Sequence, residues 1–134
     1  MICSSKHVYG RIGPIKDALE KAGHQITLPN SYEDPMLEER TKAEASERHV
    51  ALKAKLLWEQ GEKISSVEAI LVVNFEKGSQ ANYIGGATFL ECYKAFELGK
   101  KIYLMNPIPR NAFEDELRGM SPVVINQDLG RIPS

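Results

Sequence analysis

One continuous apolar run constrains the fold of this chain more than any other feature. Residues 69–74 read Ala-Ile-Leu-Val-Val-Asn, with no polar side chain before the last position. A strand with one face in water alternates apolar and polar residues, whereas an unbroken β-branched run is typical of a parallel strand that is covered on both faces. We therefore expect a parallel sheet at the centre of the fold.

Shorter apolar segments on either side of this run predict four further strands, with helices between them. The strands are expected at 1–3, 25–28, 101–105 and 123–125, and the helices at 14–22, 37–61, 87–98 and 112–118. This alternation predicts an α/β fold, a flavodoxin-like three-layer sandwich with a five-stranded parallel sheet. The chain has 134 residues, so we expect a single domain over 1–134.

The charged segment 37–61 shows only a narrow apolar pattern. Val50, Ala54, Leu57 and Trp58 form a narrow apolar stripe at i, i+4, i+7 and i+8, and the first half is polar on every side. We expect a helix that faces solvent, either broken or used in a subunit contact. Trp58 is expected in the core or in an interface.

The charge balance excludes several classes of function. The chain carries 17 Lys+Arg and 18 Asp+Glu, so its net charge of −1 predicts neither a nucleic acid polymer nor an anionic membrane as partner. No apolar run reaches the roughly 20 residues needed to span a bilayer. The start of the chain lacks the apolar stretch of a signal peptide, and Cys3 and Cys92 form no disulfide framework. We expect a cytoplasmic protein with no cofactor and, because its three histidines lack ligand spacing, no metal site.

The fold class places a ligand crevice at the carboxyl ends of the strands. Ser4 and Ser5 follow the first expected strand, and Asn74 ends the third. The turn Gly85-Gly86 precedes a helix, where paired glycines admit a ligand to the backbone and the helix N-terminus favours anions. We expect these residues to line one site, with Lys6 and Arg11 near enough to meet a phosphate.

Glu91 is the most informative single residue of this region. It lies one turn into the helix among apolar neighbours, an expensive position for a carboxylate. One interpretation is structural, because Thr88-x-x-Glu91 matches a capping box in which the glutamate bonds back to the helix start. The other is a catalytic carboxylate that faces the crevice.

Several motifs together resemble the nucleoside 2-deoxyribosyltransferase-like superfamily, which includes deoxynucleoside 5′-monophosphate N-glycosidases. The resemblance covers the C-terminal half and the first strand, loop and helix, whereas residues 31–64 match poorly. The matching stretches are Val72-Val73-Asn74, Tyr83-Ile84-Gly85-Gly86-Ala87-Thr88, Glu91 and Leu98-Gly99-Lys100-Lys101. The resemblance implies that Glu91 is a nucleophile that attacks the anomeric carbon and forms a covalent glycosyl-enzyme.

The resemblance also implies substrate-binding roles for several residues. Ser4 and Ser5 would bind sugar or phosphate, Tyr83 would contact the nucleoside, and Asn74 would hold a sugar hydroxyl. Family enzymes often carry an aspartate at the position of Asn74, and an amide cannot protonate the leaving base. Two functions are therefore expected: a hydrolase or transferase of nucleotide metabolism that acts on the N-glycosidic bond, or a non-catalytic nucleotide-binding or sensing module.

The helix at 87–98 carries more apolar surface than one sheet covers. One stripe contains Phe89, Cys92, Tyr93 and Phe96, and a second contains Ala87, Leu90, Ala95 and Leu98. We therefore expect the helix to be covered once by its own sheet and once by another copy of the chain, giving a homodimer or a higher homo-oligomer.

Overall fold

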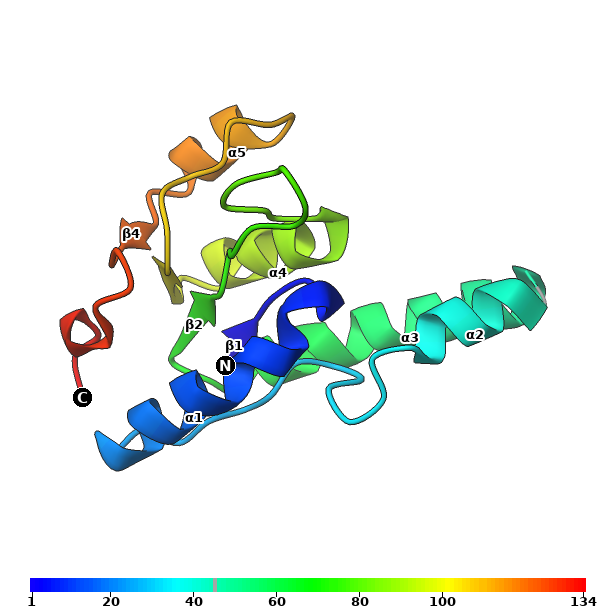
Figure 1. The fold of residues 1–134 in the computed structure, drawn as a ribbon, viewed down its shortest axis with the longest axis horizontal. Helices are drawn as coiled ribbons and strands as arrows, with labels where there is room; N and C mark the ends of the chain where they lie inside the picture. Colours follow the sequence, from blue (N-terminus) through cyan, green and yellow to red (C-terminus); the bar gives the residue numbers. More distant parts are fainter. Residues whose placement is uncertain (45) are drawn as a thin grey trace.

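The computed structural model describes residues 1–44 and 46–134, and a parallel four-stranded sheet lies at its centre (Figure 1). The strands are β1 (Ile2–Cys3), β2 (Ala69–Val72), β3 (Lys101–Leu104) and β4 (Val123–Val124), and they lie side by side in this order. Cys3 pairs with Val72, Val72 with Leu104, and Leu104 with Val124. The α/β class and the parallel sheet are thus confirmed.

Helices occur in each segment where the sequence predicts one. Within the expected helix at 37–61, residues 37–44 fall on α2 and residues 46–61 on α3, which continues to Ser65. The full set comprises the 3-10 helix η1 (Lys6–Arg11), α1 (Ile12–Lys21), α2 (Leu37–Glu44), α3 (Ser46–Ser65), α4 (Gly86–Glu97), α5 (Glu114–Gly119) and the 3-10 helix η2 (Leu129–Arg131). Among the described residues, none of these helices is long and apolar enough to cross a membrane.

The sheet separates two apolar clusters because successive strand residues point to opposite faces. Ile70 and Val72 pack with buried residues of α3, α4 and α5. Leu71 and Val73 pack with buried residues of α1 on the other face. Helices therefore flank the sheet on both sides, as the unbroken apolar run of β2 predicts.

The expected fifth strand at 25–28 is wrong. Ile2 N–H donates to Thr27 C=O at 2.9 Å, whereas the neighbouring bonds of β1, at Met1 and Cys3, are made to Leu71 and Val73. Strand residues direct their backbone groups alternately to the two sides, so Ile2 is the one residue of β1 that faces residues 25–28. Its N–H makes the single backbone bond on this side, and no ladder forms. Residues 26 and 28 still pack against the apolar cluster on the α1 side.

The apolar stripe expected along α3 does not face the core. The buried residues of α3 are Leu56, Gln60 and Ile64, whereas Val50 is 67% and Trp58 77% exposed. Trp58 is two positions from both Leu56 and Gln60, about 200° around the helix, and so points away from the buried face. Placement of Trp58 in the core is therefore wrong, and its place in an interface stays a prediction.

Candidate functional site

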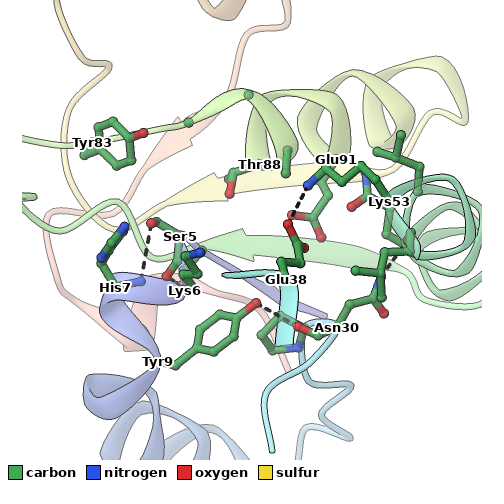
Figure 2. Close-up of a pocket in the computed structure, with 18 of the residues that line it drawn as sticks. Ser5, Lys6, His7, Tyr9, Asn30, Glu38, Lys53, Tyr83, Thr88 and Glu91 are labelled. Carbon is green, nitrogen blue, oxygen red and sulfur yellow. Dashed lines mark hydrogen bonds and ion pairs between the residues drawn. The ribbon is translucent and has the colours of Figure 1, made fainter. Parts of the chain in front are cut away.

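A cavity of ≈ 290 Å³ opens beside the carboxyl end of β1, between η1, α3 and the start of α4 (Figure 2). It lies where the sequence predicts a crevice. All but one of the expected site residues line this cavity: Ser4, Ser5, Tyr83, Gly85, Gly86 and Glu91. The exception is Asn74. Residues from opposite halves of the chain thus meet in one pocket.

The Glu91 carboxylate reaches this pocket from the second turn of α4. The helix begins at Gly86 with Gly85 as its N-cap, so Thr88 lies inside the helix and cannot be the cap. The capping-box interpretation of Thr88 and Glu91 is therefore wrong. Glu91 is only 5% exposed, and the space it faces is the pocket. A buried carboxylate without a capping role needs another explanation.

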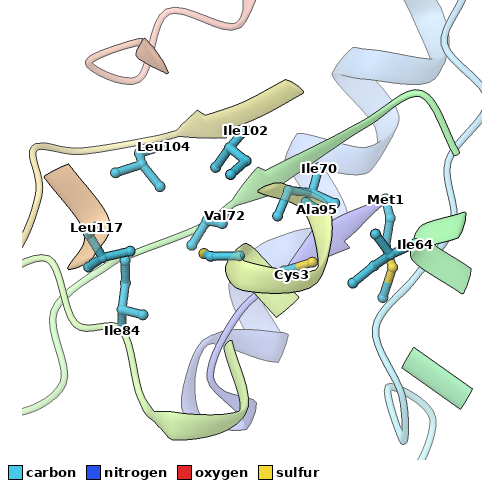
Figure 3. Close-up of a cluster of buried hydrophobic side chains, with 11 residues drawn as sticks. Met1, Cys3, Ile64, Ile70, Val72, Ile84, Ala95, Ile102, Leu104 and Leu117 are labelled. Carbon is cyan, nitrogen blue, oxygen red and sulfur yellow. The ribbon is translucent and has the colours of Figure 1, made fainter. Parts of the chain in front are cut away.

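Burial raises the pKa of Glu91 to about 7, because a low-dielectric surrounding disfavours the charged form. A hydrogen bond from the Cys3 thiol and the nearby Lys63 and Lys53 ammonium groups lower that pKa in part. Cys3 itself lies in the apolar cluster between the sheet and α4 (Figure 3). Burial raises the pKa of this thiol well above its usual range, so Cys3 stays protonated and donates. The Glu91 carboxyl therefore keeps its proton to a much higher pH than an exposed glutamate does.

The loop after β1 presents two hydroxyls on the same side of the pocket. Ser4 is buried, and its hydroxyl donates to the Ser5 carbonyl at 3.1 Å. The Ser5 hydroxyl accepts from the His7 N–H at 3.4 Å and caps η1. A hydroxyl that accepts one bond can still donate another, so Ser5 can bind a sugar or phosphate oxygen.

The two glycines of the turn have different roles. A Cβ at Gly85 would come within 2.9 Å of the Tyr83 hydroxyl, so Gly85 makes room for this ring. The Lys77 ammonium lies 4.7 Å from the centre of the same ring. A Cβ at Gly86 would meet nothing within 4 Å. The Tyr83 ring therefore explains the glycine at position 85, whereas no protein atom requires one at position 86, and its ligand role stays a prediction.

Asn74 lies outside the pocket and is only 1% exposed. Its amide nitrogen donates to the carbonyls of Asn106 and Pro107 at 3.0 and 3.1 Å. Its amide oxygen accepts from the Asn106 N–H at 2.9 Å. The side chain is thus engaged with the loop that follows β3 and is not directed to the pocket.

Sequence reasoning missed several residues that line the pocket. Glu38 and Glu39 of α2 and Lys53 of α3 belong to the charged segment, whose composition is equally typical of a solvated helix face. Thr88 is only 3% exposed, and Figure 2 shows its hydroxyl turned toward the pocket. Lys6, expected near a phosphate, does line the pocket, whereas Arg11 pairs with Glu76 instead.

Residues 1–44 and 46–134 contain no group of three His, Cys, Asp or Glu side chains placed to hold a metal ion. Comparison with protein-family models, with curated proteins and with solved structures gave no match.

Proposed function

We propose that the pocket binds a nucleoside or nucleotide and that Glu91 cleaves its N-glycosidic bond. The observation that carries this proposal is the buried Glu91 carboxylate, which faces a polar cavity and serves no capping role. A glutamate in such a position suits attack on an anomeric carbon, where the transition state is oxocarbenium-like. The family resemblance of the motifs around Glu91 supports the same chemistry.

The reaction has two steps. In the first, an ionised Glu91 oxygen attacks C1′ of the sugar, the C1′–N bond breaks, and the base leaves with the bonding electron pair and takes up a proton. In the second, water attacks C1′ of the glycosyl ester, which releases the sugar and restores the carboxylate. A second nucleobase in place of water gives deoxyribosyl transfer. Because the pKa of Glu91 is about 7, the first step requires a pH near or above this value.

The substrate is held by groups around Glu91. Ser4, Ser5 and Thr88 offer hydroxyls to the sugar or to a 5′-phosphate, and Tyr83 offers a ring to the nucleoside. The backbone N–H groups at the start of α4 favour an anionic or polar oxygen beside Gly86. The scaffold is best described as a flavodoxin-like sandwich in which residues 25–28 lie where a fifth strand would pair with β1.

A non-catalytic nucleotide-binding module is the second candidate. Asn74 favours it, since its amide is engaged with Asn106 and Pro107 and the carboxyl end of β2 supplies no group to the pocket. In that case the pocket would bind the same ligands without turnover, and Glu91 would act as a hydrogen-bonding group.

Self-association is compatible with both candidate functions. An apolar groove of ≈ 670 Å³ runs between α3 and α4, and its lining includes Trp58, Leu90, Tyr93 and Leu98. All four side chains are exposed. The groove also contains Leu57, which lines the candidate site as well. We propose that a second copy of the chain covers this groove, and that the protein acts as a homodimer or a higher homo-oligomer.

Base release from a panel of nucleosides and 5′-monophosphates, followed by chromatography, tests the proposed function. Release by the wild type that disappears in Glu91→Ala supports N-glycosidic cleavage. No release from any member, together with melting-temperature shifts on adding nucleotides, favours the binding module. Faster turnover of monophosphates than of the matching nucleosides would indicate that the hydroxyls and lysines that line the pocket bind a 5′-phosphate.

A further inference from the structure

Two carboxylates of α2 form ion pairs with lysines that line the candidate site, and Figure 2 shows the pair between Glu38 and Lys53. Glu39 pairs with Lys6, which belongs to η1 beside the Ser4-Ser5 loop. Glu38 pairs with Lys53 of α3, with 3.2 Å between the ammonium nitrogen and the carboxylate oxygen. These contacts link α2 to two separate walls of the pocket.

The helix α2 lies against α3 along its length, but little of this contact is apolar. Thr41 is its only buried residue among those described, and its hydroxyl lies within hydrogen-bond distance of carbonyls of the same helix and of the His49 ring. The helix is polar on nearly every side and buries little apolar surface, which is typical of elements that open at low cost. The Asp34–Arg40 ion pair lies within the 34–40 segment itself and does not fasten it to the pocket.

The two lysines are also the cations that an anionic ligand would need. Lys6 borders the hydroxyls of the loop after β1, and Lys53 is close enough to Glu91 to lower the pKa of that carboxyl. Both lysines are already paired with carboxylates of α2. An entering anionic group therefore competes with Glu38 and Glu39 for the same ammonium groups.

We propose that α2 is a gate over the pocket, which Glu38 and Glu39 hold closed until an anionic ligand takes over Lys53 and Lys6. This inference rests on the proposed binding site but not on the catalytic step. All four side chains are partly exposed, so each pair is weak and the exchange of partners is readily reversible. The gate makes entry selective for ligands with a negative charge, such as phosphate monoesters, over neutral nucleosides.

The test compares Glu38→Gln/Glu39→Gln with Glu44→Gln, both in a Glu91→Gln background that prevents turnover. Glu44 is a matched control, because it also lies on α2 and pairs with an exposed arginine, Arg48, away from the pocket. Calorimetry measures binding of the four deoxynucleoside 5′-monophosphates and the matching nucleosides. Hydrogen–deuterium exchange follows the amides of residues 37–44 with and without each ligand.

The gate predicts that the double variant binds monophosphates about three- to tenfold more tightly, with nucleoside affinity and the Glu44→Gln control unchanged. It also predicts faster amide exchange of α2 when a monophosphate binds. The gate would be overturned if the double variant bound monophosphates no more tightly than the control, or if no monophosphate bound at all. It would also be overturned if amide exchange of α2 were the same with and without a monophosphate. If the gate is supported but the wild type releases no base, only the catalytic proposal fails.

Discussion

The side chain of Asn74 and the backbone of Asn106 hydrogen-bond to each other in both directions. The Asn74 amide nitrogen donates to the Asn106 carbonyl at 3.0 Å, and the Asn106 N–H donates to the Asn74 amide oxygen at 2.9 Å. The Asn106 side chain in turn donates to the Asn74 carbonyl at 3.3 Å. The ends of β2 and β3 are thus fastened together by a buried amide, which only a group with both a donor and an acceptor can replace.

Asn74→Asp should therefore destabilise the fold. The new carboxylate would face the carbonyls of Asn106 and Pro107 without the two N–H donors, in a buried position. We expect a loss of about 3 kcal/mol in the free energy of unfolding, measured by urea denaturation. The matched change Asn111→Asp, at an exposed position, should cost much less. Equal stability of Asn74→Asp and the wild type would show that the amide does not fasten this loop.

The raised pKa of Glu91 predicts how stability depends on pH. The folded protein holds the proton up to about pH 7, whereas the unfolded chain releases it near 4.5, so ionisation of Glu91 opposes folding. Relative to Glu91→Gln, the wild type should lose about 3 kcal/mol of stability between pH 4 and pH 8.5. Urea denaturation of both proteins at these pH values measures the difference.

The exposed Glu97→Gln on the same helix is the control and should follow the wild type at both pH values. A difference between the wild type and Glu91→Gln that is independent of pH would mean that the Glu91 carboxyl titrates in its normal range.

The two glycines of the turn should respond differently to an added methyl group. Gly86→Ala meets open space and should keep or slightly raise the melting temperature, because alanine costs less backbone entropy at the start of a helix. The methyl group would nevertheless project from the pocket wall and weaken nucleotide binding. Gly85→Ala should displace the Tyr83 ring and lower the melting temperature. Thermal unfolding and calorimetric titration of both variants decide this, and identical behaviour of the two would contradict the assignment.

The sequence predicts the sheet well because burial on both faces of β2 leaves a visible pattern, the unbroken run from Ile70 to Val73. It fails at residues 25–28, where the apolar pattern is present but a single backbone bond, from Ile2 to Thr27, joins the segment to the short β1. In the candidate site, the sequence points to Glu91 because a carboxylate among apolar neighbours is costly, and to the turn at 85–86 because two glycines precede a helix. Glu38 and Lys53 are not, because a charged side chain on a polar helix looks the same whether it faces solvent or a pocket.

The apolar groove between α3 and α4 predicts self-association. Trp58 is the single tryptophan of the chain and is 77% exposed, so its fluorescence reports directly on whether a second copy covers the groove. We expect light scattering to give a dimer or larger species and Trp58 emission to shift to shorter wavelength as concentration rises. Tyr93→Glu, inside the groove, should give monomers, whereas Val50→Glu, an exposed position outside it, should not. A wild-type monomer at high concentration would refute this prediction.

The role of Glu91 is tested most directly by the initial rate of base release from the best substrate of the panel, measured between pH 5 and pH 9. If Glu91 is the nucleophile, the wild-type rate should rise with pH through about 7 and level off above it, since only the carboxylate attacks. Glu91→Gln should lower the rate by about a thousandfold or more at every pH, with substrate binding retained. Base release by Glu91→Gln at a rate near that of the wild type would contradict the proposed mechanism.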